Sequence, residues 1–157
     1  MASLESFGLD SYQPTAFYFK VTFAATLGLS DTSFQEVSGI KVEIETESYT
    51  EGGENRYIHQ LPKAAKSSNL VLKRGISAID SALYIWCKAV FEGGFLLPIT
   101  PMPVFVYLMN DQKIPVRSWC FANAYPVSWE ADPFNSTKNE VAIEKIELSY
   151  SYFTRLT

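Results

Sequence analysis

The chain has 157 residues, of which 47% are hydrophobic and 15% aromatic, a composition that indicates one folded domain and argues against a disordered chain. Its 13 Lys and Arg residues against 17 Asp and Glu give a net charge of −4, which disfavours a nucleic-acid clamp. The basic residues that come closest to forming a cluster are Lys63, Lys66, Lys73 and Arg74, and such a group is typical of solvated loop ends.

Signals for secretion and membrane insertion are missing from the sequence. Residues 1–17 lack a basic region followed by an apolar core, so we expect folding in a cytosol. The apolar stretch 95–109 is broken by prolines and is shorter than the roughly 18 residues of a membrane-spanning helix. Cys87 and Cys120 lack a CxxC spacing, and we expect two small buried thiols without a redox role.

The first predicted elements are strands. Aromatic and apolar residues alternate with polar ones over 17–23, and a turn region follows at 28–33. A second strand begins after Gly39, where the alternation predicts one face on a core and one in water. Its apolar positions are Ile40, Val42 and Ile44, and its charged positions are Lys41, Glu43, Glu45 and Glu47.

A long polar excursion separates this strand from the next. Glycines and polar residues occupy 51–55, the Leu61-Pro62 pair stops any helix, and a third strand runs from about Asn69 to Gly75. The excursion is far longer than a hairpin needs, and loops of this length in a compact domain are usually functional or disordered. We therefore treat residues 48–66 as a candidate contact arm, with an unpartnered solvent loop as the alternative.

One helix and a hairpin are predicted next. Ser77 and Asp80 fit a capping box, and Gly93-Gly94 ends the helix. A hairpin is expected from strands over 104–109 and 114–121, with Trp119 and Phe121 on one face. The helix residues expected to share one face are Ile79, Leu83, Trp86 and Val90.

The C-terminal segment shows a change of parity. Val141 and Ile143 set one alternation and Ile146 and Leu148 the other, which predicts a bulge near residues 144–145 or a strand that leaves one sheet for another. Together the elements predict a single domain that is mainly β with one packed α-helix, arranged as a two-sheet β-sandwich or barrel with a long loop between its second and third strands.

Catalytic and metal-binding patterns are weak. His59 is the only histidine, which rules out a histidine-rich zinc site and leaves one base for any triad. Glu43 and Glu45 share a strand face, but an exposed face explains them more simply than acid–base catalysis. Gly52-Gly53 is followed by no GK[ST] motif. We predict no catalytic, cofactor-binding or metal-binding residue.

Two blocks of sequence resemble one known family. The first contains FQEVSGI, an acidic strand, EGGENR, a proline-containing segment, LVLKRG and a helix with a central tryptophan. The second is WCFANAYPVSWEADPFNSTKNEVAIEKIELSYSYFT, residues 119–154. In order and spacing these motifs resemble the tail-tube proteins of contractile phages and contractile injection systems, and the match covers most of the chain.

The resemblance implies a structural protein. It implies a homohexameric ring whose inward strands close into one β-barrel, rings stacked into a tube for cargo or DNA, an N-terminal arm at 1–15, and a loop at 48–66 that reaches the adjacent ring. Ring closure would also satisfy open strand edges. The residues expected between rings are Glu51, Gly52, Gly53, Glu54, Asn55, Arg56 and Tyr57. Those expected to face the lumen are Glu43, Glu45 and Glu47, with the opposite sheet face as the alternative.

The expected partners are adjacent tube rings, a spike or baseplate hub and surrounding sheath proteins. We expect assembly in the bacterial cytoplasm, and an extracellular or virion-associated location after release. Residues 28–33, 98–107 and 150–155 favour the relatives that form the first rings beside the spike. A type VI secretion ring protein that carries effectors is one alternative, and an enzyme with a lipocalin-like small-molecule pocket is a distant one.

Overall fold

The computed structural model describes residues 17–23, 30–53, 55–76, 81–94, 96, 98–132, 137 and 142–157. Within these ranges the chain forms nine β-strands and one α-helix. The elements are β1 (Tyr18–Phe23), β2 (Ser30–Ser38), β3 (Val42–Tyr49), β4 (His59–Ser67), β5 (Leu70–Gly75), α1 (Ala82–Glu92), β6 (Met102–Met109), β7 (Pro115–Ala131), β8 (Ile143–Ser149) and β9 (Tyr152–Arg155).

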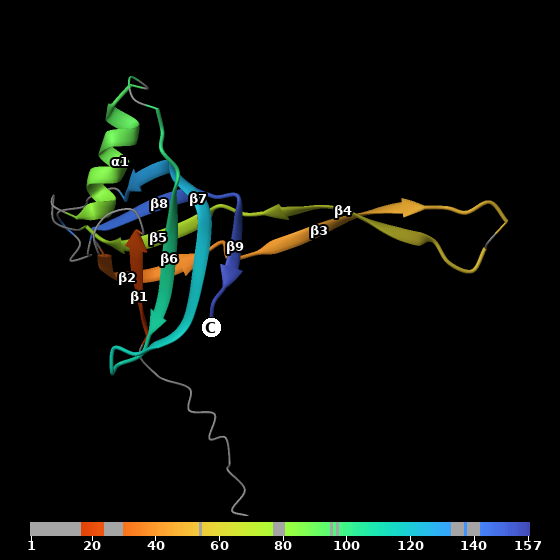
Figure 1. The fold of residues 1–157 in the computed structure, drawn as a ribbon, viewed down its shortest axis with the longest axis horizontal. Coiled ribbons are helices and arrows are strands. Elements are labelled where there is room, and N and C mark those ends of the chain that lie inside the picture. The colour runs from red at the N-terminus through yellow and green to blue at the C-terminus, as the bar shows by residue number, and fades with distance from the viewer. Residues whose placement is uncertain are drawn as a thin grey trace, which may run out of the picture.

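Six strands close into an antiparallel barrel (Figure 1). The larger sheet has the order β6-β1-β2-β5-β8-β7-β9, and the additional pairing of β6 with β7 completes the circle. Closure is possible because β7 is 17 residues long, so its first half pairs with β6 and β9 while its second half pairs with β8. A closed barrel leaves no open edge among its six strands.

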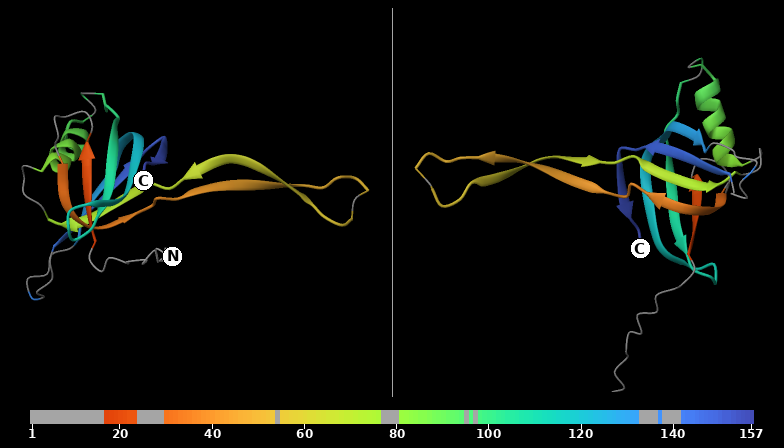
Figure 2. Two further views of the ribbon diagram at one scale, coloured as in Figure 1. Left: turned by 60° about the horizontal axis from the view of Figure 1, so that its bottom comes forward. Right: turned by 180° about the vertical axis from the view of Figure 1, so that it is seen from behind.

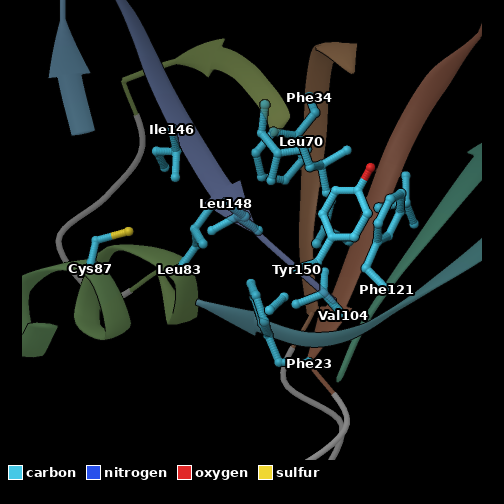
Figure 3. Packing of buried hydrophobic residues seen from close by; sticks show 14 residues of the cluster. Phe23, Phe34, Leu70, Leu83, Cys87, Val104, Phe121, Ile146, Leu148 and Tyr150 are labelled. Atoms are coloured by element: carbon cyan, nitrogen blue, oxygen red, sulfur yellow. The ribbon is translucent and has the colours of Figure 1, made fainter. Parts of the chain in front are cut away.

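Side chains fill the barrel interior, and α1 covers one end of it (Figure 3). Phe34, Leu72, Val104 and Phe121 are fully buried or nearly so, and they belong to one apolar cluster. The helix contributes Leu83 and Cys87 to that cluster, because both lie on the α1 face that points to the barrel. Burial of this cluster is the main apolar contribution to folding.

Two barrel strands continue beyond the barrel as a second, two-stranded sheet (Figure 2). β2 leads through residues 39–41 into β3, and β4 leads through 68–69 into β5, so one long hairpin runs from the barrel into solvent. We call residues 42–67 the arm. Apart from Glu54, which lies outside the described residues, every arm residue is exposed except the half-buried His59.

The predicted strand over Val42 to Glu47 is present, but the prediction that one of its faces packs on a core is wrong. Ile44 is 60% exposed, whereas Leu72 on the barrel part of the same hairpin is fully buried. The reason is that β3 and β4 form a sheet of only two strands, and no other described element packs on either face. Alternation alone does not reveal whether another layer of the chain covers the apolar side.

The predicted 48–66 loop is largely ordered as a hairpin. Residues 59–67 form β4, and Pro62 pairs with Thr46 within it. A further strand was missed at 30–38, so residues 30–33 of the predicted turn belong to β2 while Gly28 lies outside the described residues. Both strands lack clear alternation of apolar residues, which is why the pattern did not indicate them.

The predicted helix is confirmed, with a different N-terminus. It begins at Ala82 with Ser81 as N-cap, whose Oγ accepts a hydrogen bond from the Tyr84 amide at 3.1 Å, and Gly93 is the C-cap as predicted. The proposed cap, Ser77 with Asp80, and the face residue Ile79 lie outside the described residues. Of the remaining face residues, Leu83 is buried and Trp86 and Val90 are half-buried.

The hairpin of β6 and β7 is confirmed, and Phe121 with the half-buried Trp119 packs toward the core. The predicted change of face near residue 144 is wrong. β8 pairs with β5 without a register shift from Leu148 to Ile143, and one parity is buried throughout because Glu144 occupies an inward position. Val141 lies outside the described residues. The sequence suggested a change of face because Glu144 was taken for an exposed residue, whereas it is buried.

The fold class is confirmed: the chain is mainly β, with one helix and two sheets. Cys87 is buried as expected, whereas Cys120 is only half-buried. In the described part of the chain, no helix has the length and apolar character needed to cross a membrane.

Glu144 is the partner of a buried arginine. Arg74 of β5 lies directly opposite it in the register, and the guanidinium Nε and Nη2 lie 3.2 Å and 3.1 Å from Glu144 Oε1. The side chains are only 3% and 6% exposed. Arg74 Nη2 also donates to the N-cap oxygen of Ser81 at 2.7 Å, and its guanidinium lies 5.1 Å from the centre of the Phe34 ring. This network joins β5, β8 and α1 at one end of the barrel.

Replacing Glu144 tests this network. We expect Glu144→Gln to lower the free energy of unfolding by about 3 kcal/mol or more, because the buried guanidinium of Arg74 loses its counter-charge. The matched control is Lys73→Gln, which removes the exposed pair with Glu36 (3.2 Å) one position earlier in β5 and should cost less than about 1 kcal/mol. Urea denaturation followed by tryptophan fluorescence measures both; equal losses would contradict a role for the buried pair.

The two parts of the long hairpin should respond differently to the same substitution. We expect Leu72→Ser to lower the free energy of unfolding by about 2–5 kcal/mol, because a fully buried side chain is removed from the core. Ile44→Ser should change it by no more than about 0.5 kcal/mol, since this side chain is exposed in the single chain. Denaturation at a concentration where the chain is monomeric tests both; a large loss for Ile44→Ser would show that the arm is packed.

Candidate interaction surface on the arm

The register of the arm separates its side chains onto two faces. Val42 lies opposite Ser67, and Ile44 lies opposite Ala65. Because successive residues point to opposite sides of a strand, these residues share one face with other uncharged ones. That uncharged face consists of Val42, Ile44, Thr46, Ser48, Gln60, Pro62, Ala65 and Ser67. The opposite side, which we call the charged face, consists of Glu43, Glu45, Glu47, Tyr49, His59, Leu61, Lys63 and Lys66.

Each predicted lumen carboxylate has a lysine beside it. Glu45 lies 3.8 Å from Lys66, and Glu47 lies 3.5 Å from Lys63. Glu43 pairs with Lys41, and the hydrogen bond and the positive charge of that lysine hold the pKa of the Glu43 carboxyl below its usual value. All of these groups are exposed, so the pairs contribute little to stability. They do place opposite charges side by side, so this face is not purely acidic.

Aromatic and apolar side chains gather at the far end of the arm. Tyr49, Tyr57 and Ile58 are each more than half exposed. The Tyr57 ring contacts the edge of His59 at a centroid distance of 4.9 Å, and His59 Nε2 lies 3.3 Å from Glu51 Oε2. Exposed aromatic residues beside polar ones are typical of protein interfaces.

The tip also contains an open recess. Its volume is about 500 Å³, and it is lined by Thr50, Asn55, Arg56, Tyr57 and Ile58. The chain reverses direction nearby at Gly53, whose φ of +95° is a conformation that favours glycine. A recess bordered by an arginine and a tyrosine can accept a side chain of another protein chain, since these residue types dominate the binding energy of interfaces.

The structure brings the residues predicted between rings together at the end of the arm, far from the barrel (Figure 1). They are Glu51, Gly52, Gly53, Asn55, Arg56 and Tyr57; Glu54 lies outside the described residues. Sequence reasoning missed Tyr49 and Ile58, because it treated the segment as polar. The sequence does indicate them, because Tyr49 and Ile58 are large apolar residues that flank the Gly52-Gly53 turn on its two sides.

Neither a metal cluster nor a lipocalin-like cavity is found among the described residues. They hold no group of three or more His, Cys, Asp or Glu placed to bind a metal. A lipocalin-like enzyme needs a deep apolar cavity, but here Phe34, Phe121 and the other core side chains occupy the barrel interior (Figure 3). The distinctive surface of the molecule is therefore the arm.

Comparison with known proteins identifies the family of the chain. The family model "T4-like virus tail tube protein gp19" matches residues 15–154. No curated protein matches the chain. A chain of the anti-feeding prophage (AFP) baseplate is 25% identical, with a TM-score of 0.74 over 92% of this chain and 96% of that one.

Two further solved structures share the fold. A chain of the sheath–tube complex of the extracellular contractile injection system PVC, in the extended state, is 21% identical, with a TM-score of 0.74 over 100% of this chain and 99% of that one. Hcp1 from Flavobacterium johnsoniae is 14% identical, with a TM-score of 0.56 over 88% of this chain and 94% of that one. Because the family model covers nearly the whole sequence, the chain belongs to the tail tube protein family of T4-like viruses and is a structural protein of contractile injection systems, not an enzyme.

Proposed function

We propose that this chain forms a homohexameric ring, and that rings stack through the arm into the tube of a phage tail or contractile injection system, a channel for cargo or DNA. The observation that carries the proposal is the exposed uncharged face of the arm. An isolated two-stranded ribbon is at best marginally stable in water, and Val42 and Ile44 gain from burial only when another chain covers them.

The open edges of the arm support the same proposal. Within the described ranges β3 and β4 pair only with each other, which leaves one edge of each strand without a neighbouring strand there. Unpaired edges bind further strands, and identical subunits that join β3 of one copy to β4 of the next satisfy both edges at once. Such a contact is head-to-tail, and a head-to-tail contact that closes produces a ring.

The arm tip is the proposed contact between rings. Tyr57 supplies an aromatic anchor there, and Tyr49 and Ile58 add apolar area around it. The remaining contacts are polar and come from Glu51, Gly52, Gly53, Glu54, Asn55 and Arg56. Since a tip of mixed character buries its apolar part and keeps its rim polar, it suits a contact between preformed rings.

The charged face is the proposed lumen wall. Glu43, Glu45 and Glu47 stay hydrated there, whereas the uncharged face lies against neighbouring copies. Because lysines pair with these carboxylates, six copies would give a wall of alternating charge with a weak net field. Such a wall neither holds nor strongly repels a passing polyanion.

The proposed partners follow from the similar structures. Likeness to a chain of the AFP baseplate supports a baseplate or spike hub, and likeness to the PVC sheath–tube complex supports a surrounding sheath. The proposed location is the bacterial cytoplasm during assembly and the virion or extracellular particle after release.

A tube-initiating ring beside the spike is the second candidate, favoured by the AFP baseplate likeness. An initiator alone should stop at one or two rings, whereas a main-tube subunit should polymerise. A type VI ring protein that carries effectors is the further alternative, since the solved structure of a type six secretion system protein shares the fold.

Shortening the arm tests the proposed function. Glu43 and Lys66 are register partners, so an Asn-Gly turn that replaces residues 44–65 closes the hairpin without strain. We expect a folded barrel that no longer stacks, because the tip and most of the uncharged face are gone. Negative-stain electron microscopy measures ring and tube formation, and circular dichroism with thermal unfolding checks the barrel.

Three point variants accompany the shortened arm, and the third is the control. Tyr57→Ala should reduce stacking and leave single rings, whereas Ile44→Ser should weaken the rings themselves. Gln112→Ala, in the exposed turn between β6 and β7, should change neither stacking nor ring formation. Long tubes from the shortened chain would refute the role of the arm, and a persistent monomer of the full chain at high concentration would refute the ring.

A further inference from the structure

The root of the arm is the place where the long hairpin leaves the barrel, and its backbone is tightly constrained there. Gly39 has a φ of +85°, and the Lys41 amide donates to the Gly39 carbonyl at 2.9 Å, which forms a three-residue turn. A Cβ on Gly39 would lie 1.9 Å from the Asn69 carbonyl oxygen. The two connections, 39–41 and 68–69, therefore touch at a position that admits only glycine.

One tyrosine bridges both connections. The Tyr150 hydroxyl donates to the Gly39 carbonyl at 3.4 Å, just before β3 begins. Ser67, the last residue of β4, also lies beside this hydroxyl, and its hydrogen bonding lowers the pKa of Tyr150 against the rise that burial causes. Tyr150 follows β8, so a residue far away in the sequence joins the two strands of the arm at their base.

The Tyr150 ring itself is held in the barrel (Figure 3). It is 9% exposed, and it meets Phe121 of β7 edge-on at a centroid distance of 4.9 Å and Phe153 of β9 at 6.1 Å. Burial raises the pKa of the Tyr150 hydroxyl, so the neutral form that donates to Gly39 is favoured in the folded chain. A rigid ring with its polar end at the arm root is suited to hold the root in one orientation.

Little else fixes the direction of the arm. Among the described residues, neither β3 nor β4 packs extensively on any barrel element. The arm projects away from the barrel in each view of Figure 2. A small rotation at the root therefore displaces the tip by a large distance, because the arm is long and the tip is the part farthest from the barrel.

We infer that Tyr150 is a positioning residue that sets the direction in which the arm leaves the barrel. The inference about the arm stands on the single chain. Its consequence for assembly rests on the proposed function: the orientation of the arm fixes where the tip of one ring meets the next ring. Tyr150 then controls how regularly rings stack, although it contacts no other ring itself.

The direction of the arm can be measured by double electron–electron resonance between two spin labels. Thr46→Cys on β3 and Gln112→Cys in the β6–β7 turn provide exposed label sites. Cys120→Ser removes the half-buried thiol, and Cys87 is buried. Dilution with excess unlabelled protein suppresses distances between copies.

Tyr150→Phe removes the hydroxyl and keeps the ring, so we expect a broader and shifted distance distribution with unchanged far-ultraviolet circular dichroism. The matched control is Tyr152→Phe, because Tyr152 is 63% exposed on β9; it should leave the distribution as in the parent. Ser67→Ala removes only the hydrogen bond to β4, changes no core residue and should give an intermediate broadening. An unchanged distribution in both Tyr150→Phe and Ser67→Ala would overturn the inference.

Cryo-electron microscopy of assembled particles separates this inference from the proposed function. We expect Tyr150→Phe to form rings that stack into short or irregular tubes, whereas Tyr152→Phe tubes match the parent. If the parent forms no rings, the proposed function fails while the resonance experiment still decides the role of Tyr150. Regular tubes from Tyr150→Phe together with a broadened distribution would show that assembly, not Tyr150, orients the arm, and would overturn the assembly consequence.

Discussion

A single antiparallel hairpin that crosses from an apolar core into water is the constraint on which the rest of this structure depends. Its barrel part, β2 with β5, is fixed by buried side chains such as Phe34 and Leu72. Its outer part, β3 with β4, has only cross-strand pairs and exposed ion pairs. The residues that fold the subunit and the residues proposed to join subunits therefore lie on the same two chain segments but do not overlap. Substitutions in one part are expected to leave the other nearly unchanged.

The buried pair of Arg74 and Glu144 anchors the barrel part of that hairpin. Two charges removed from water are costly, and the geometry here compensates with two contacts to one carboxylate oxygen, one to Ser81 and an aromatic face. The same serine caps α1, so the arginine links the start of the helix to two strands. An apolar substitute of equal size would lose this directionality. The pair fixes how the helix sits on the barrel end more than it adds net stability.

Prediction from sequence succeeded where a residue pattern has one physical meaning. The β6–β7 hairpin and the end of α1 at Gly93 followed from alternation, turn residues and glycine. Prediction failed where burial depends on distant partners. Glu144 is charged but inward, because Arg74 lies opposite it, and Ile44 is apolar but exposed, because β3 and β4 form a separate sheet of two strands.

The role of the arm between rings stays a prediction, and only its shape can be compared with the sequence. The glycines predicted in the excursion, Gly52 and Gly53, lie in the turn at the tip of the arm, and Tyr57 lies beside them. The second strand of the arm was not visible, since Pro62, Lys63 and Lys66 suggest a loop although β-pairing holds them. A proline is tolerated there because it lacks a backbone N–H, and a strand at the edge of a sheet does not need an N–H from every residue to pair with its neighbour. Edge position, which allows that proline, is a property of the fold and not of the local sequence.

Barrel closure also orders the events of folding. The strands of the arm are neighbours in sequence, with Val42 opposite Ser67, so their hairpin closes a short loop. The barrel needs β1 beside β6, with Tyr18 opposite Met109, and that contact joins distant parts of the chain. On a ribosome the arm can therefore form before most of β6 and β7 has been synthesised. A nascent chain would expose an assembly surface before its barrel exists, and the lysines and the proline of β4 are the features that discourage premature strand pairing at that stage.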